Sequence, residues 1–228
     1  MNIGSNNIEM VQTVAKGLEK FLDELVFVGG AVTSLYIEDG AARTIRPTED
    51  VDCVVQIAKR SDYTALEKKL RELGFKHFVG NNAPMCRWIY NGVKVDIMPN
   101  DPKILGFANR WYDEGLKNKV QIILPDGQKI SILTLPLFIA TKIEAFHGRN
   151  ERDFRISHDI EDIITVLDGQ LDFKKFDEAP QAVKEYLKAQ FKEFLADSVF
   201  IESISGHMEF GYQNKGRVKR IIDFLGNR

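Results

Sequence analysis

The chain has little cysteine and no long apolar run. Only two cysteines occur in 228 residues, Cys53 and Cys86, and each lies inside an apolar stretch typical of a strand. Such a pair favours buried free thiols in a reducing compartment over a disulfide. No run approaches the ~20 apolar residues that a membrane helix needs, and no charged-then-apolar signal segment opens the chain. These absences predict a cytoplasmic protein with no membrane partner.

Several catalytic signatures are missing as well. The four histidines are scattered and lie near no paired cysteines, which argues against a zinc site. There is neither the glycine-lysine segment of a P-loop nor the Gly-x-Ser-x-Gly elbow of a hydrolase. The net charge of −2 excludes a globally basic nucleic-acid coat. The composition is that of an ordinary globular protein, long enough for one large domain or two small ones.

An apolar run that ends in a diglycine is the first positive signal. Leu25–Val28 is a short strand-like segment, and Gly29 and Gly30 follow it directly. Glycine allows a tight turn and lets a bulky group approach the backbone. A short helix is expected over residues 31–37, and amides at a helix start favour an anion such as phosphate. The alternative is that the diglycine only turns the chain between strand and helix.

A pair of acids follows the polar loop over residues 38–49. Asp50 and Asp52 alternate with apolar residues, so both carboxylates should project from the same face of one strand. Two adjacent acids repel unless a cation or a proton lies between them, and Mg²⁺ is the usual cation. In the loop, Arg46 could contact a phosphate, although pairing with a nearby carboxylate is the favoured alternative. Thr48 is expected to turn the backbone into the strand.

A third acid lies on a predicted hairpin. Asn91-Gly92 is a strong turn signal between strands over residues 86–90 and 93–98. In the second strand Asp96 lies on the face opposite three β-branched residues. Its role depends on whether this strand runs beside the one that carries Asp50 and Asp52.

The remaining periodicity predicts an α+β fold. Helices are expected over residues 8–25, 61–73 and 104–117, and a second hairpin over 120–124 and 129–133. From there the pattern is helical, with helices over residues 135–146, 158–167, 173–177, 181–196 and 216–225. The change in pattern predicts two domains, an α/β domain over residues 1–133 and a helical domain over 134–228 packed against it.

The combination of Gly29-Gly30, Asp50-x-Asp52 and Asp96 resembles the DNA polymerase beta-like nucleotidyltransferase superfamily. The long gap after the diglycine and the segment Arg46-x-Thr48-x-Asp50-x-Asp52 look like its AbiEii-like branch, which includes toxins of type IV toxin–antitoxin systems. The resemblance covers residues 26–168 and implies a nucleotidyltransferase-type mixed sheet with flanking helices, followed by an all-helical C-terminal domain. It also implies Mg²⁺ or Mn²⁺ bound by the three aspartates and a nucleoside triphosphate (NTP) seated on the glycines.

A second motif supports this resemblance in the helical half. Lys142, Ala145 and Arg149 match a Lys-x-x-Ala-x-x-x-Arg segment, and the family's Asp-x-x-Asp follows as Asp159 and Asp162. By resemblance, Lys142 would contact the triphosphate, Asp159 would reach toward the active site and Asp162 would order the helical domain. Taken alone, a helix lysine such as Lys142 is more often a solvated residue.

These observations predict a Mg²⁺-dependent nucleotidyltransferase that moves a nucleoside monophosphate from an NTP to an acceptor hydroxyl and releases pyrophosphate. Its site is expected in the cleft between the two domains. The toxin relatives imply an RNA 3′ end, such as that of tRNA, as acceptor. Two alternatives stay open: a catalytically silent NTP- or partner-binding module, and a toxin with a cognate antitoxin that acts on a protein or small molecule. The basic residues from 215 to 220 could bind RNA, although a solvated helix face is the favoured explanation.

Overall fold

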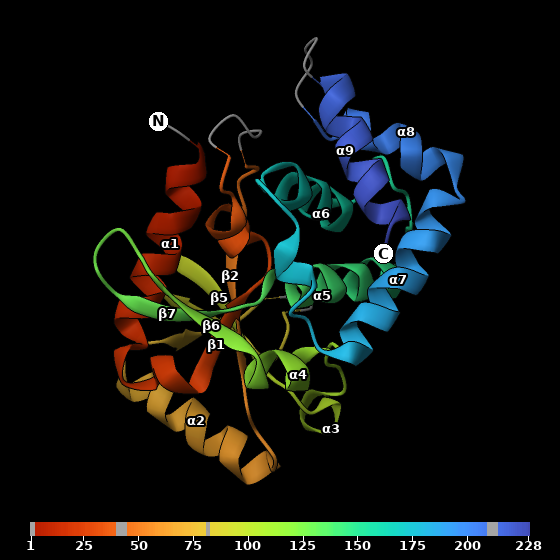
Figure 1. The fold of residues 1–228 in the computed structure, drawn as a ribbon. Coiled ribbons are helices and arrows are strands. Elements are labelled where there is room, and N and C mark those ends of the chain that lie inside the picture. Colours follow the sequence, from red (N-terminus) through yellow and green to blue (C-terminus); the bar gives the residue numbers. More distant parts are fainter. Residues whose placement is uncertain (1–2, 40–44, 81–82, 209–213) are drawn as a thin grey trace. The chain divides into compact units, whose positions relative to one another are not determined.

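The structure is a computed structural model that describes residues 3–39, 45–80, 83–208 and 214–228 (Figure 1). The chain forms two compact units. The first consists of residues 1–32 and 46–133, and the second of residues 33–45 and 134–228. Residues 33–45, which lie before the predicted boundary at residue 133, therefore group with the second unit. Among the described residues, no helix is long and apolar enough to cross a membrane.

The first unit contains a seven-stranded mixed sheet in the order β3-β4-β5-β2-β1-β7-β6. Strand β2 runs parallel to β5 and β1 parallel to β7, and the other neighbours are antiparallel. All the expected strands are confirmed within one or two residues, and only the short β3 was not expected. The strands are β1 (Leu25–Val28), β2 (Asp50–Val55), β3 (Lys76–His77), β4 (Arg87–Tyr90), β5 (Val93–Pro99), β6 (Lys119–Ile123) and β7 (Lys129–Leu133).

The hairpin between β4 and β5 has a two-residue turn. Asn91 and Gly92 have φ angles of 47° and 84°, and positive φ at both positions is the requirement of a type I′ turn. Such a turn fixes the register of its strands, so that Arg87 lies directly opposite Asp96. The predicted Asn-Gly hairpin is confirmed.

The helices of the first unit depart from prediction in two places. They are α1 (Ile3–Gly17), the 3-10 helix η1 (Glu19–Glu24), α2 (Arg60–Glu72), α3 (Pro102–Leu105) and α4 (Tyr112–Lys117). A single helix over residues 8–25 was wrong, because α1 ends at Gly17, where an added Cβ would lie 2.6 Å from the Tyr90 ring. A single helix over 104–117 was also wrong: Gly106, at φ 85°, ends α3 in the left-handed conformation.

Each face of the sheet carries helices. Helix α1 contacts β2, β4 and β5, and the Tyr63 hydroxyl of α2 donates to the Ile97 carbonyl on the same face. On the opposite face, α4 contacts β1 and β2, and the Tyr112 hydroxyl lies 3.8 Å from the Met98 sulfur. The strand side chains under α1 and α2 form much of the core, namely Val51, Cys53, Trp88, Val95 and Ile97.

Both cysteines are free and buried, as predicted. Burial raises the pKa of the Cys86 thiol to about 12, and it also raises the pKa of Cys53 well above the ordinary value. Neither thiol is suited to react at neutral pH, because the thiolate is the nucleophile.

The second unit is built from helices in its described residues. They are α5 (Leu135–Gly148), α6 (His158–Asp168), the 3-10 helix η3 (Lys174–Phe176), α7 (Gln181–Leu195), α8 (Ser198–Gly206) and α9 (Asn214–Gly226). Helix α8 was not expected, and the helix predicted over residues 173–177 is a single 3-10 turn. The helix predicted over residues 31–37 is likewise a 3-10 helix, η2 (Gly30–Tyr36).

Candidate active site

The register of the sheet brings three carboxylates together. Strands β2 and β5 are parallel, and Asp52 is the direct partner of Asp96. Because side chains alternate along a strand, Asp50, Asp52 and Asp96 project from the same face, with adjacent strands about 4.8 Å apart. The Asp96 side chain is 10% exposed and that of Asp50 is 28% exposed. The strand of Asp96 therefore does lie beside the strand that carries the acid pair.

Gly29 makes room for one of these carboxylates. Its φ is +75°, and a Cβ at this position would collide with Asp52 Oδ2 and lie 3.0 Å from its Cγ. A Cβ at Gly30 would lie 3.0 Å from Nη2 of Arg46. Gly29 thus permits the positive φ of the turn and also leaves space for the Asp52 carboxylate. The binding of phosphate by these two glycines stays a prediction.

Arg87 is the main residue that sequence reasoning missed. Its Nε donates to Asp96 Oδ1 over 2.8 Å, and its Nη2 donates to Asp96 Oδ2 over 2.7 Å and to Asp50 Oδ2 over 2.8 Å. The hydrogen bond to Asp96 raises the pKa of Arg87 above its ordinary value, although burial opposes this. We call Asp50, Asp52, Asp96 and Arg87 the acid cluster.

A signal for Arg87 was present in the sequence. In a two-residue hairpin the residues that flank the turn are paired, so counting outward from Asn91-Gly92 places Arg87 opposite Asp96. Opposite charges directly across two strands stabilise each other. The pairing of the hairpin, and not only its existence, would have identified the partner of the third acid.

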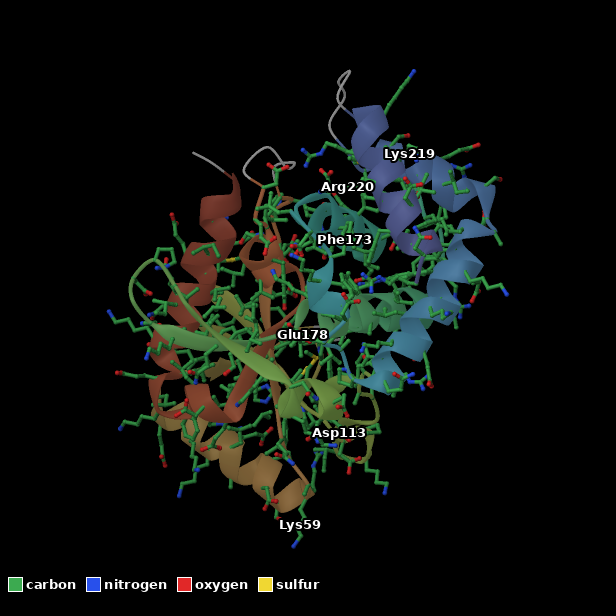
Figure 2. The ribbon with its side chains drawn as sticks, viewed as in Figure 1. Lys59, Asp113, Phe173, Glu178, Lys219 and Arg220 are labelled. Atoms are coloured by element: carbon green, nitrogen blue, oxygen red, sulfur yellow. The ribbon has the colours of Figure 1, made fainter. Side chains whose placement is uncertain are left out.

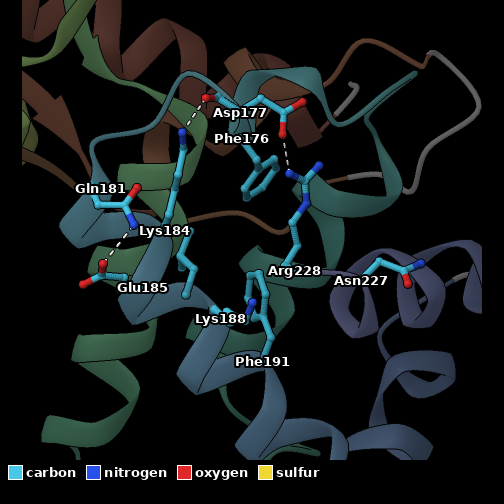
Figure 3. Close-up of a pocket in the computed structure, with 10 residues that line it drawn as sticks. Phe176, Asp177, Gln181, Lys184, Glu185, Lys188, Phe191, Asn227 and Arg228 are labelled. Atoms are coloured by element: carbon cyan, nitrogen blue, oxygen red, sulfur yellow. Dashed lines mark hydrogen bonds and ion pairs between the residues drawn. The ribbon is translucent and has the colours of Figure 1, made fainter.

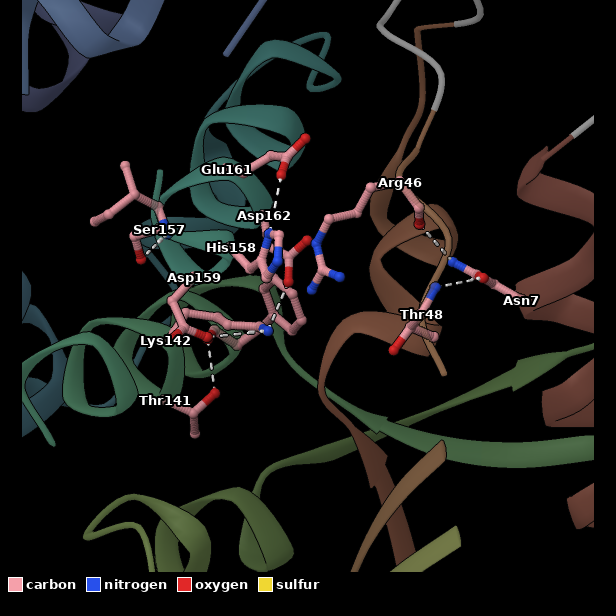
Figure 4. Close-up of polar contacts among 12 residues, drawn as sticks. Asn7, Arg46, Thr48, Thr141, Lys142, Ser157, His158, Asp159, Glu161 and Asp162 are labelled. Atoms are coloured by element: carbon pink, nitrogen blue, oxygen red, sulfur yellow. Dashed lines mark hydrogen bonds and ion pairs between the residues drawn. The ribbon is translucent and has the colours of Figure 1, made fainter. Parts of the chain in front are cut away.

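Asn7 on α1 holds the loop that leads into β2. It is fully buried. Its side-chain amide donates to the Arg46 carbonyl over 3.0 Å, and its Oδ1 accepts from the Thr48 amide over 3.1 Å (Figure 4). The Thr48 hydroxyl then donates to Asp50 Oδ1 over 3.3 Å. Thr48 lies just before β2, and its hydroxyl orients Asp50. Asn7 was missed, although it lies one helical turn before Val11 on the apolar face of α1. Residues 40–44 of this loop lie outside the described residues.

The acid cluster offers the donor atoms that Mg²⁺ prefers, which are carboxylate oxygens. Among the described residues, no group of three His, Cys, Asp or Glu side chains is already arranged to hold a metal ion. The guanidinium of Arg87 is hydrogen-bonded to the same oxygens of Asp50 and Asp96 that an ion would use. The donor chemistry fits Mg²⁺ or Mn²⁺, and an ion that reached these two carboxylates would compete with Arg87.

Lys142 lies in a second group of charges, within the second unit. Its Nζ lies 2.6 Å from Asp162 Oδ2 and 3.4 Å from Asp159 Oδ1 (Figure 4). Arg149 Nε donates to Asp159 Oδ2 over 2.6 Å. The Lys142 side chain is 9% exposed, so the alternative of a solvated lysine is wrong. We call Lys142, Arg149, Asp159 and Asp162 the ion cluster.

The ion cluster favours the charged form of the Asp159 carboxylate. Burial by itself would raise the pKa of Asp159, but the charge of Lys142 and the hydrogen bond from Arg149 outweigh burial and hold that pKa below its ordinary value. Helix α5 ends at Gly148, so Arg149 meets Asp159 from just beyond the helix end. His158, before Asp159, is exposed and lies 3.5 Å from Glu161.

Two of the C-terminal basic residues hold the second unit together. Arg217 Nε donates to Asp168 Oδ1 over 2.6 Å, and Arg220 Nη2 donates to the Asp168 carbonyl over 2.7 Å. The Arg220 guanidinium also lies 5.6 Å from the ring centre of Phe173 (Figure 2). Neither arginine belongs to a solvated face, and that part of the prediction was wrong. Lys219 on the same helix is exposed.

A cavity of about 350 Å³ lies elsewhere in the second unit, along α7 (Figure 3). Phe176 and Phe191 line it together with Lys188 on α7, and Asp177 pairs with Arg228 at its edge. None of the site residues predicted from the sequence lines this cavity. The residues that line this cavity include no member of the acid cluster or of the ion cluster.

Comparison with known proteins adds no family. Neither a scan against models of protein families nor a search of curated proteins finds a match for this chain.

Proposed function

We propose that this chain is a nucleotidyltransferase that depends on a divalent metal ion. It would move a nucleoside monophosphate from an NTP to an acceptor hydroxyl and release pyrophosphate. The observation that carries the proposal is the register of β2 and β5, which sets Asp50, Asp52 and Asp96 on one sheet face beside Gly29. In this proposal the mixed sheet is of the nucleotidyltransferase type, and the helices of the second unit form its C-terminal domain.

The three aspartates would hold Mg²⁺ or Mn²⁺. When bound, such ions stabilise the negative charge that develops on the transferred phosphoryl group and make an attached hydroxyl more acidic. The chain supplies the positioning. Thr48 orients the Asp50 carboxylate through its 3.3 Å hydrogen bond. The missing Cβ of Gly29 lets Asp52 lie against the backbone. Asp96 would accept the proton of the acceptor hydroxyl.

The phosphates of the nucleotide would lie near Gly29 and Gly30, where the absence of side chains permits close approach to the backbone. Arg46, whose guanidinium lies near Gly30, would contact a phosphate oxygen. A contact between Lys142 and the triphosphate would require Lys142 to leave Asp159 and Asp162. The observed ion pairs support a structural role for Lys142 and Asp159 in the second unit.

The acceptor is defined by its chemistry as a hydroxyl, and resemblance favours the 3′ end of RNA such as tRNA. The test is incubation with each labelled NTP, Mg²⁺ or Mn²⁺, and total cellular RNA and protein. We expect label on RNA together with released pyrophosphate. Asp52→Asn should reduce turnover by about a thousandfold, the scale of losing a principal electrostatic group, while Asp62→Asn on α2 should not. Full activity of Asp52→Asn in a folded protein would contradict the proposal.

A catalytically silent module is the second candidate, and the bonds of Arg87 to Asp50 and Asp96 favour it. These bonds satisfy two of the three carboxylates with no metal ion. Calorimetry separates the two candidates. Metal-dependent nucleotide binding with no pyrophosphate release in any acceptor screen would support the module.

A toxin role with a cognate antitoxin is a further proposal drawn from the resemblance. Expression in a bacterial host tests it directly. Growth arrest that Asp52→Asn relieves would support a toxin, and normal growth on expression of the active protein would contradict it.

A further inference from the structure

Arg87 is the shared cation of two carboxylates. One guanidinium makes a two-pronged contact with Asp96 and a third hydrogen bond to Asp50. Its place is set by the type I′ hairpin, which pairs Arg87 with Asp96 across β4 and β5. The contact is therefore built into the sheet and does not depend on a flexible loop.

The hydrogen bonds account for every carboxylate oxygen of Asp50 and Asp96. Both oxygens of Asp96 and Oδ2 of Asp50 accept from Arg87, and Oδ1 of Asp50 accepts from Thr48. A divalent cation uses the same oxygens as ligands. With the guanidinium 2.7 to 2.8 Å from these oxygens, a second cation there would meet strong like-charge repulsion. A metal ion and Arg87 would therefore compete for the Asp50 and Asp96 carboxylates.

An Arg87 guanidinium released from the carboxylates is suited to bind phosphate. Its planar fork of N–H donors fits phosphate oxygens as well as it fits a carboxylate. The Arg87 side chain is 22% exposed, so its guanidinium is not sealed inside the core. Its positive charge is retained at any physiological pH.

We propose that Arg87 is an exchangeable counter-ion: a divalent cation displaces it from Asp50 and Asp96, and the displaced guanidinium then binds phosphate oxygens of the nucleotide. This inference rests on the proposed function, because it needs the acid cluster to bind a metal ion. Arg87 would thereby neutralise the Asp50 and Asp96 carboxylates in the metal-free protein and help to bind the substrate in the metal-bound one.

The test measures Mn²⁺ binding without turnover. The free Mn²⁺ signal in electron paramagnetic resonance gives the dissociation constant (Kd) of the full-length protein in the absence of nucleotide. We expect Arg87→Ala to bind Mn²⁺ about tenfold more tightly than the wild type, since hydrogen bonds to charged groups are of this strength. With Mn²⁺ saturating, the same variant should bind a non-hydrolysable ATP analogue about tenfold more weakly.

Lys94→Ala is the matched control. Lys94 lies on the same face of β5 as Asp96, and it pairs with Glu49 over 2.9 Å. Its removal deletes one positive charge near the cluster and leaves the Arg87 contacts intact. We expect its Mn²⁺ affinity to stay within about twofold of the wild type, because exposed ion pairs contribute little.

The possible outcomes distinguish a failure of the Arg87 exchange from a failure of the proposed metal-dependent function. Equal or weaker Mn²⁺ binding by Arg87→Ala would overturn the exchange while leaving a metal-dependent enzyme intact. An equal gain in Arg87→Ala and Lys94→Ala would also overturn it, since general electrostatics would explain both. If the wild type and both variants bind no Mn²⁺, the proposed function fails, and the exchange fails with it.

Arg87→Lys is a second test, for use if Arg87→Ala does not fold. Lysine keeps the charge but has no planar fork, so it cannot bridge Asp50 and Asp96 as arginine does. We expect a smaller gain in Mn²⁺ affinity than for Arg87→Ala, and a larger rise in melting temperature on adding Mn²⁺ than the wild type shows. No difference from the wild type in either measurement would count against the exchange.

Discussion

The acid cluster and the ion cluster both pair aspartate carboxylates with basic side chains, but they differ in exposure and in the balance of charge. In the acid cluster one guanidinium serves Asp50 and Asp96, whose side chains are 28% and 10% exposed. In the ion cluster two cations meet two carboxylates, and both carboxylates are at most 3% exposed. A partly exposed group of acids that shares one cation can exchange that cation for another. Lys142 and these two carboxylates form a buried charge pairing that is costly to break, which favours a structural role for the ion cluster.

The largest expected effect on stability comes from breaking the ion cluster. Lys142→Met would leave two buried carboxylates without their lysine, and removal of one partner from a buried pair costs about 3–5 kcal/mol. Urea denaturation should show this loss in the free energy of unfolding. Lys188→Met removes an exposed lysine of α7 and should change stability by less than about 0.5 kcal/mol.

Replacing the basic residue of the acid cluster by methionine should lower the free energy of unfolding by less. Arg87→Met leaves Asp50 partly open to water, so we expect a loss of about 1–2 kcal/mol. If Arg87→Met destabilised the protein more than Lys142→Met, the contrast between the two clusters would be broken, and the acid cluster would be structural too.

Gly29 tests whether the acid cluster depends on close approach to the backbone. Gly29→Ala adds both left-handed strain, about 1–2 kcal/mol, and a collision with Asp52. Gly92→Ala is the control: it has φ +84° and nothing within 4 Å of an added Cβ. Both variants should lose similar stability from strain. Only Gly29→Ala should also lose Mn²⁺ affinity, measured by paramagnetic resonance, and equal Mn²⁺ binding by the two would show that the position of Asp52 is unimportant.

The geometry of the acid cluster was largely predictable because it is local. Strand periodicity put Asp50 and Asp52 on one face and gave the face of Asp96, and the Asn91-Gly92 turn predicted the hairpin that carries Asp96. The parallel pairing of β2 with β5 was only a condition in the prediction, since strands distant in sequence are paired by the packing of the whole sheet. Arg87 was missed even though the hairpin register determines its partner.

The ion cluster was less predictable because it is tertiary. The resemblance singled out Lys142 for the triphosphate and Asp159 for the active site, but the pairing of Lys142 with Asp159 and Asp162 depends on how α5 packs on α6. Helical periodicity does not encode that packing. The two missed helix breaks lie at glycines in otherwise continuous helical patterns. Gly106 ends α3 in the left-handed conformation, and Gly17, where α1 ends, lies against the Tyr90 ring.

The pH dependence of stability tests whether charge holds the ion cluster together. The pKa of Asp159 is lowered in the folded protein, and an unfolded aspartate titrates at about 3.9. The stabilisation from Asp159 is therefore fully present above about pH 4 and is lost as the pH falls through the lower, folded pKa. The difference in unfolding free energy between the wild type and Lys142→Met should shrink as the pH is lowered from 7 to 3. A difference that stayed constant would show that Lys142 acts by packing and not by charge.

The smallest expected effect concerns the orientation of Asp50. Thr48→Val keeps the shape of the side chain but removes the hydroxyl that donates to Asp50 Oδ1. One such hydrogen bond contributes about 0.5–1.5 kcal/mol, so nucleotidyl transfer should slow by about fivefold. Thr48→Ser keeps the hydroxyl and should retain most of the rate. If Val and Ser behaved alike in the pyrophosphate-release assay, Asp50 would be positioned by its strand alone, and the acid cluster would need no support from the loop that Asn7 holds.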